Sequence, residues 1–439
     1  MGLTESGKDN AMRMKHLIAL SAVLGLVLAP AAYAANGMYD VRDYGAVGDG
    51  VTDDTSAFQN ALNAANNDGG GLVTVPAGQF MIATRLNVPA NVALEGVSSV
   101  PPSANPTNGG SVLLSVVGAG STAGDPFIKL NTCSTLRRIT VFYPNQTDTN
   151  PPVAYPYCIG AAPWADNCSL IDVTLVNPYW GIDFGDHKAV GRHYIDGLWA
   201  QALNLGIYVN ACFDIGRLLN CHFGPIWTTG PAKDYMRWNA TAFLFGRTDV
   251  EETYNCSAEG YMAGFRFTAL PIEVEPGQWE NQSGAGRLIN ATTRDCFTAI
   301  WADDTMVGAG WGVGSSNLEG KVFASTSMRG ELHFTNCNIS VPWGSDRMVQ
   351  VQYGGSSQWA IGFQDCHFGP MSTGYTMEVN SYAFMCHNCT FDESPTDIWL
   401  QGSIQKVNIG CNTMKGGCYI LDQSSANDKI MWSNFGATN

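Results

Sequence analysis

Acidic side chains that could cleave a glycosidic bond gather in two parts of the sequence. Such hydrolysis needs two carboxyl groups, ~5 Å apart in retaining enzymes and ~6.5–9.5 Å apart in inverting ones. In the first group Asp303 and Asp304 follow an apolar segment, and Glu273 and Glu275 stand in the long polar segment before it. We favour this group, with Arg266 beside it, because a loop acid above a strand acid gives an adjustable spacing. The same acids could instead cap turns.

The second group consists of Asp183, Asp186 and His187, with Tyr208 as its expected neighbour. His187 and Tyr208 are also candidates for an alternative reaction, β-elimination by a polysaccharide lyase. That reaction needs a base and a cation that neutralises a uronate. The candidates for these two tasks are Arg247, Arg266, Tyr208, His187 and Lys233. A Ca²⁺ ion held by Asp303 and Asp304, or by Glu251 and Glu252, could also supply the charge.

Short strands of one kind recur along the chain and would position these residues. Most of them follow a four-residue pattern, in which a small residue is followed by an apolar, a variable and a second apolar residue. The pattern occurs at 181–184, 206–209, 242–245, 264–267, 299–302, 348–351, 376–379 and 397–400. The long interval before 348 predicts one more strand at 321–324. A weak repeat of roughly 20 to 50 residues is typical of a solenoid.

Alternation along these strands predicts which side chains face solvent. The outward column is Asp183, Tyr208, Leu244, Arg266, Trp301, Gln350, Glu378 and Trp399. Aromatic rings can stack on sugar rings, while amides, carboxylates and Arg can bind hydroxyl groups. We therefore predict a carbohydrate groove whose binding residues are Tyr208, Trp301, Gln350, Glu378, Trp399, Arg247 and His187. Asp183 and Asp303 lie four strands apart, roughly 19 Å, and so belong to separate centres.

The segment 39–80 supplies the family resemblance. It contains a short strand, a Gly/Asp turn, a helix whose apolar stripe is Ala57, Phe58, Ala61, Leu62 and Ala65, and a buried strand ending at Pro76. This segment resembles the start of the pectate-lyase-like superfamily, which includes rhamnogalacturonase-like and epimerase-like proteins. The resemblance implies an all-β, single-stranded right-handed parallel β-helix over residues 35–439, with an N-terminal capping helix. Asp43, Asp49, Asp53 and Asp54 are then expected in turns and caps.

Residues 1–34 are predicted to be a leader and signal peptide. A basic start at Arg13 and Lys15 precedes a short apolar segment, and small residues lead to a cleavage site after Ala34. The apolar segment is too short to cross a bilayer of ~30 Å. We therefore expect a secreted or periplasmic protein with no membrane partner.

The net charge of the chain limits which classes of molecule it is expected to bind. Lys and Arg number 23 against 38 Asp and Glu, giving a net charge of −15. Nucleic-acid binding is excluded because it needs clustered positive charge. The acidity favours a neutral sugar or a Ca²⁺-assisted site, whereas the oligomeric state stays open.

The 13 cysteines follow a structural pattern. Six come directly after Asn or Asp and a seventh continues the series: Cys221, Cys256, Cys296, Cys337, Cys366, Cys389 and Cys411. We predict an inward stack of mostly free thiols beside an Asn ladder. Zinc binding by Cys386, His387 and Cys389 is disfavoured because His and Cys alternate faces in a strand.

The hypothesis that follows is an exported polysaccharide-active enzyme, with hydrolysis by paired carboxylates favoured. The two alternatives are a polysaccharide lyase and a non-catalytic carbohydrate-binding or adhesin-like β-helix. No residue match selects among the enzyme families that share the expected fold.

Overall fold

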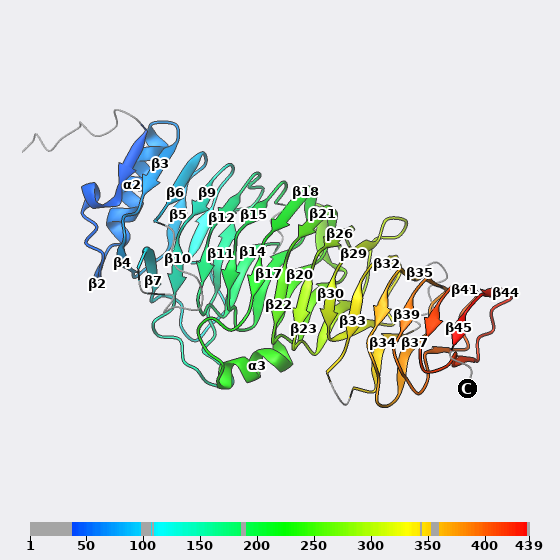
Figure 1. Ribbon diagram of the computed structural model, residues 1–439. Coiled ribbons are helices and arrows are strands. Elements are labelled where there is room, and N and C mark those ends of the chain that lie inside the picture. Colours follow the sequence, from blue (N-terminus) through cyan, green and yellow to red (C-terminus); the bar gives the residue numbers. More distant parts are fainter. Residues whose placement is uncertain are drawn as a thin grey trace, which may run out of the picture.

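Three parallel β-sheets run side by side along one elongated solenoid, as Figure 1 shows. The computed structural model describes residues 37–97, 107, 109–185, 190–342, 345–352 and 360–436. The predicted signal peptide at 1–34 lies outside the described residues. Each turn of the chain adds one strand to each sheet in most of the molecule, which confirms the predicted right-handed parallel β-helix.

We call the sheets A, B and C. Sheet A contains, in spatial order, β1 (Met38–Asp40), β3 (Gly71–Thr74), β6 (Val92–Glu95), β9 (Thr135–Arg137), β12 (Ser169–Ile171), β15 (Tyr194–Asp196), β18 (Cys212–Leu219), β21 (Thr248–Tyr254), β26 (Gly286–Ile289), β29 (Trp311–Gly314), β32 (Glu331–Thr335), β35 (Ala360–Gln364), β38 (Ala383–His387), β41 (Lys406–Gly410) and β44 (Asp428–Trp432).

Sheet B follows sheet A in each turn. Its strands are β2 (Asp49–Asp53), β4 (Gly78–Ile82), β7 (Ser111–Ser115), β10 (Thr140–Phe142), β13 (Thr174–Leu175), β16 (Trp199–Ala200), β19 (His222–Phe223), β22 (Ser257–Glu259), β27 (Thr292–Arg294), β30 (Asn317–Glu319), β33 (Asn338–Ser340), β36 (His367–Phe368), β39 (Thr390–Phe391), β42 (Thr413–Met414) and β45 (Phe435–Gly436).

Sheet C carries the predicted site. Its strands are β5 (Leu86–Val88), β8 (Ile128–Leu130), β11 (Tyr157–Ala161), β14 (Trp180–Phe184), β17 (Leu205–Val209), β20 (Thr241–Phe245), β23 (Ala263–Phe267), β28 (Thr298–Ala302), β31 (Lys321–Ala324), β34 (Arg347–Val351), β37 (Tyr375–Val379), β40 (Ile398–Leu400) and β43 (Ile420–Asp422). Strand β31 is the additional strand that the sequence predicts at 321–324.

The register of sheet C confirms the outward column. Asp183 pairs with Tyr208, Tyr208 with Leu244, Leu244 with Arg266, and Arg266 with Trp301. The column then continues through Phe323, Gln350, Glu378 and Trp399. Because the residues on either side of this column point inward, the apolar stacks of the core hold the register. One such stack is Phe243 on Phe265, whose ring centroids are 4.6 Å apart.

Helix α2 (Thr55–Asn67) caps the N-terminal end of the solenoid, as predicted (Figure 1). Its whole apolar stripe is buried, and the Phe58 ring packs edge-on against Phe80 at 5.2 Å. Asp54 accepts hydrogen bonds from the backbone N–H groups of Val47 and Gly48 at 2.7 and 3.1 Å. This acid therefore holds the preceding turn, which is a structural role.

A second helix, α3 (Pro231–Asn239), forms where the sequence suggested only a long insertion. Pro231 suits the first helical turn because its missing N–H is not needed there. Asp148, from a distant loop, accepts a hydrogen bond from the N–H of Ala232 at 2.9 Å. The cap comes from 84 residues away, so local sequence does not reveal it. No helix in the described part of the chain is long and apolar enough to cross a membrane.

An Asn ladder lines the turn between sheets A and B. Asn220, Asn255 and Asn290 occupy the left-handed region, with φ of 52°, 53° and 55°. The amide of Asn255 donates to Asn220 at 2.7 Å, and that of Asn290 donates to Asn255 at 3.1 Å. Asn tolerates this conformation better than most residues, and its side chain ties each turn to the next.

Five of the seven cysteines take the predicted inward position after this turn: Cys221, Cys256, Cys337, Cys366 and Cys389. Two predictions were wrong. Cys296 lies at the next turn, between β27 and β28, and Cys411 occupies the left-handed position itself, with φ of 57° and an exposed side chain. All 13 thiols are free, and ten of them are buried.

The ladder predicts a stability order for two variants of Asn255. Asn255→Ala should lower the free energy of unfolding by about 1–2 kcal/mol, because alanine loses the amide contacts and is strained at positive φ. Asn255→Gly loses the same contacts but tolerates the conformation, so its loss should be smaller. Thermal unfolding followed by circular dichroism measures both, and an equal loss would contradict the conformational argument.

Candidate functional site

Asp303 stands at the centre of a three-residue cluster on sheet C. It follows β28 directly, and its Oδ2 accepts hydrogen bonds from Arg266 Nε at 2.9 Å and Nη2 at 2.7 Å. Its Oδ1 accepts from Trp301 Nε1 at 2.9 Å. The Arg266 guanidinium also lies 4.7 Å from the centre of the Trp301 ring. Three predicted site residues therefore meet, and both oxygens of the Asp303 carboxylate accept hydrogen bonds within the cluster.

Asp304, predicted as a second catalytic acid, does not join this cluster. Its side chain is buried, and its Oδ2 accepts from Arg329 Nε at 2.7 Å. Its Oδ1 accepts from the backbone N–H groups of Thr305 and Arg329 at 3.0 and 2.9 Å. Adjacent residues leave a strand on opposite sides, so Asp303 and Asp304 face different partners.

Glu273 and Glu275 lie on an antiparallel hairpin, formed by β24 (Leu270–Glu275) and β25 (Gln278–Gln282). Glu273 accepts the N–H of Gly277 at 2.6 Å, and Glu275 accepts the amide of Gln278 at 3.0 Å. Both acids are exposed and are bonded within the hairpin turn. The sequence predicted an acidic loop here, whereas these contacts give the two acids a role in the hairpin itself.

The second centre is partly described. Asp183 is buried, and its Oδ1 accepts the N–H of Gly185 at 3.0 Å, whereas Asp186 and His187 lie outside the described residues. Tyr208, next to Asp183 in the column, stacks on Tyr157 with ring centroids 6.5 Å apart.

Sequence analysis missed two aromatic residues of this region. Trp180 lies 4.8 Å from Tyr157, centroid to centroid, and both stand at the starts of paired strands. The sequence signal for both is an aromatic residue at the first position of its strand.

A third cluster surrounds Glu378. Its carboxylate accepts hydrogen bonds from Arg347, from Gln401 and, at 3.4 Å, from Gln350. Trp399, the next residue in the column, packs against Tyr375 with ring centroids 4.8 Å apart. The predicted residues Gln350, Glu378 and Trp399 are thus brought together, whereas Arg347 and Tyr375 were missed.

Arg247 lies outside the outward column. Its Nε donates to Gln282 of the hairpin at 3.2 Å, its Nη2 pairs with Asp249, and its guanidinium is 5.6 Å from the Phe213 ring. The residue therefore braces the base of the hairpin. Nothing in these contacts directs it towards a ligand on sheet C.

The acids considered for Ca²⁺ are divided between different partners. Glu252 lies 3.8 Å from Arg287, whereas Glu251 is buried against His193. Asp303 and Asp304 are likewise bound by separate arginines. Ca²⁺ needs several oxygen ligands around one point, which neither pair provides as arranged. A Ca²⁺ requirement stays a prediction.

A fully buried trio of His193, Cys212 and Glu251 was not predicted. His193 Nε2 lies 3.0 Å from Glu251 Oε1, and Cys212 Sγ lies 3.8 Å from His193 Nδ1. These residue types are metal ligands, but the thiol and the carboxylate contact opposite nitrogens of one ring, which suits an ion pair. Burial by itself lowers the pKa of His193, whereas the charge of Glu251 and hydrogen bonds to Cys212 and Glu251 raise it to about 10.

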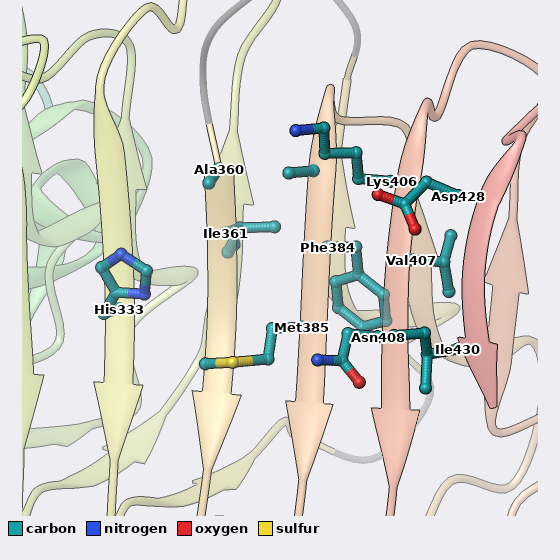
Figure 2. A pocket seen from close by; sticks show the side chains of 11 residues that line it. His333, Ala360, Ile361, Phe384, Met385, Lys406, Val407, Asn408, Asp428 and Ile430 are labelled. Carbon is teal, nitrogen blue, oxygen red and sulfur yellow. The ribbon is translucent and has the colours of Figure 1, made fainter. Parts of the chain in front are cut away.

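Two concave surfaces lie away from sheet C. Figure 2 shows a groove on sheet A whose lining includes His333, Met385, Asn408, Lys406 and Asp428. Its volume is about 350 Å³. A second groove, of about 320 Å³, lies on sheet B beside Trp199. Neither of these two grooves includes the clusters of sheet C.

Residues 38–178 match the sequence profile of the family described as "Rhamnogalacturonase A/epimerase, pectate lyase-like". The mannuronan C5-epimerase AlgE1 of Azotobacter vinelandii is 53% identical over 45 residues, which is 10% of this chain and 3% of that protein. These matches support the resemblance that segment 39–80 indicated. The chain spans only a small part of the curated relatives it matches.

Solved structures show the same fold. The N-terminal fragment of bacteriophage Phi29 gene product 12 has a TM-score of 0.62 at 14% identity, covering 90% of this chain and 70% of that one. A tailspike protein of E. coli bacteriophage HK620 has a TM-score of 0.52 at 12% identity, covering 90% and 73%. The chain thus shares the parallel β-helix architecture of these proteins.

The different surroundings of Asp303 and Asp304 predict different effects of the same substitution. Asp304→Asn should lower the free energy of unfolding by about 1–3 kcal/mol, because it weakens a buried acceptor of four hydrogen bonds. Asp303→Asn should cost less than about 1 kcal/mol, because its ion pair is partly exposed. Chemical denaturation of the two variants measures both values, and a larger loss for Asp303→Asn would contradict these roles.

The buried ion pair predicts a pH dependence of stability. The folded-state pKa of His193, about 10, lies above its unfolded value of 6.5, so its contribution is complete below pH 6.5. That contribution should be lost as the pH rises towards 10 and the imidazolium loses its proton. Melting temperatures across this range should fall more steeply for the unmodified protein than for Glu251→Gln. Parallel curves would show that the pair does not titrate in this way.

Proposed function

We propose that this protein binds a polysaccharide along the outward face of sheet C. The observation that carries the proposal is the column from Tyr208 to Trp399, in which aromatic rings alternate with hydrogen-bonding clusters in continuous register. Sugar rings present apolar faces and a rim of hydroxyl groups, and this surface offers partners for both. Its length suits an extended chain better than a single small molecule.

The charges on this surface favour a neutral or weakly charged polysaccharide. Arg266 is paired with Asp303, and Arg347 is paired with Glu378 and Asp346. Each guanidinium is thus neutralised by a neighbour, and the whole chain carries a net charge of −15. A polyanion would meet an acidic surface with few unpaired cations, which weakens its association.

Cleavage of the bound chain is the second proposal, and hydrolysis is the favoured form. Asp303 supports it because it is a partly exposed carboxylate on the binding face, beside Trp301. Its hydrogen bonds suit a base or nucleophile, so the proton donor would come from another acid, such as Glu273 or Glu275 after movement of the hairpin. Elimination is the alternative chemistry, and its candidate residues are Arg247, Arg266, Tyr208, His187 and Lys233.

The proposed setting is outside the cytoplasm. It rests on the basic start, apolar segment and cleavage site within residues 1–34. An exported protein would meet polysaccharides of a cell surface or of the medium directly.

Removal of one aromatic platform tests the binding proposal. Trp301→Ala should weaken polysaccharide binding about tenfold or more, equivalent to ~1.4 kcal/mol. The sugar would lose the ring on which it stacks, and Arg266 would lose its contact with the same ring. Isothermal titration with neutral and uronic polysaccharides measures the affinity. Trp164→Ala is the matched control, since Trp164 is 75% exposed and lies outside the column. Equal affinities in both variants would refute binding on sheet C.

The same polysaccharides separate the possible reactions. Reducing ends without new ultraviolet absorbance indicate hydrolysis, whereas absorbance of unsaturated products indicates elimination. Binding without either product identifies a carbohydrate-binding protein. A loss of activity with a chelator, restored by Ca²⁺, would support the calcium prediction. Asp303→Asn should abolish hydrolysis while keeping the fold, and full activity in that variant would exclude Asp303 as catalytic.

A further inference from the structure

The groove on sheet B is formed by three adjacent strands and the loop that follows β19. Trp199, His222 and Ser257 occupy successive positions in the register of β16, β19 and β22. The loop from Gly224 to Ile226 forms one wall, and the enclosed volume is about 320 Å³. This size is at the small end of ligand sites in proteins. The groove is on a different sheet from the Asp303 and Glu378 clusters.

The polar and aromatic groups of the groove are arranged in a fixed order. Trp199 is 42% exposed, and its ring lies 4.6 Å from that of His222, centroid to centroid. His222 Nδ1 lies 2.8 Å from Ser257 Oγ. Glu259, two residues after Ser257, therefore faces the same side of the sheet. An exposed indole thus stands beside a hydroxyl, an imidazole and a carboxylate, which together both donate and accept hydrogen bonds.

A buried glutamine makes the loop wall rigid. Gln201 is fully buried, and its Oε1 accepts hydrogen bonds from the N–H groups of Ile226, Trp227 and Thr228 at 3.0, 2.7 and 3.0 Å. Its Nε2 donates to the carbonyl of Thr228 at 2.8 Å. One side chain therefore fixes three consecutive peptides. A wall that is ordered before binding lowers the entropy lost when a ligand enters.

The charges of the groove exclude an anionic ligand. Glu259 contributes a carboxylate, and Arg294 pairs with it at 3.9 Å. Burial lowers the pKa of His222, so the imidazole is neutral at neutral pH. A phosphate, sulfate or uronate would therefore meet a negative charge without an unpaired cation. Neutral hydroxyl groups can instead bond to Ser257, His222 and Glu259 while an apolar ring face packs on Trp199.

We propose that the groove beside Trp199 is a second carbohydrate site, which binds one neutral sugar residue, alone or as part of a longer chain. The ligand class is shared with the proposed function, but the site and its residues are separate. A β-helix with sites on two sheets could hold two polysaccharide segments at once. Binding of a polymer would then be tighter than either site alone allows.

Two variants of the full chain test this site by opposite means. Trp199→Ala removes the platform, whereas Gly224→Leu fills the groove and leaves Trp199 in place. A side chain at Gly224 meets open space, because its first atom would have only Glu259 Cβ within 4 Å, at 3.6 Å. Neutral hexasaccharides of glucose, mannose, galactose and xylose are the probes, together with an oligouronate. Melting temperatures establish that each variant is folded.

We expect at least one neutral hexasaccharide to bind with two sites per chain in calorimetric titrations. Both variants should remove one of these sites or weaken it at least tenfold, whereas Trp301→Ala should affect only the other site. Trp164→Ala is the control for loss of an exposed indole. The proposal is overturned if Trp199→Ala and Gly224→Leu bind like the unmodified protein, if no neutral probe binds, or if the oligouronate is preferred at this site. Loss confined to Trp301→Ala would support sheet C alone.

Discussion

Parallel pairing between successive turns of the chain is the constraint on which this structure depends. Each strand must place its residues directly above those of the turn before, so a side chain that suits one position is repeated along the axis. The Asn ladder at the turn after sheet A is the clearest result, since Asn220, Asn255 and Asn290 share both conformation and hydrogen bonds. The same alignment places aromatic and amide side chains in one column on sheet C. Architecture and candidate site therefore have a common origin.

Pairing of carboxylates with arginines determines which interactions the surface of sheet C offers to a ligand. Asp303 and Glu378 each accept hydrogen bonds from an arginine and from further donors, so both carboxylates are held in fixed positions. Carboxylate oxygens held in this way can also accept hydrogen bonds from the hydroxyl groups of a sugar. The groups that would bind a polysaccharide are therefore already in place, whereas an acid that donates a proton would have to move into the site. This difference is why binding is the better supported function and cleavage the second.

The features that repeat along the solenoid could be predicted from the sequence. The order Asp183, Tyr208, Leu244, Arg266, Trp301 followed from two-residue alternation, and β31 followed from an interval that was too long. The features that do not repeat could not be found in this way. Asp304 turned away from Asp303 to meet Arg329, 25 residues later, and the acidic insertion at Glu273 became a hairpin. Contacts between loops, and the burial of His193, depend on neighbours that no local pattern specifies.

The burial of most of the free thiols has a consequence for the reactivity of the protein. Burial raises the pKa of Cys158, Cys168 and Cys296 to about 12 each, so almost no thiolate forms at neutral pH. Since the thiolate is the form that attacks disulfides and reacts with oxidants, these sulfurs are protected without being crosslinked. Folding therefore needs neither an oxidant nor an isomerase to select partners among 13 cysteines. The thiols exposed to oxidants in solution are those of Cys133, Cys411 and Cys418.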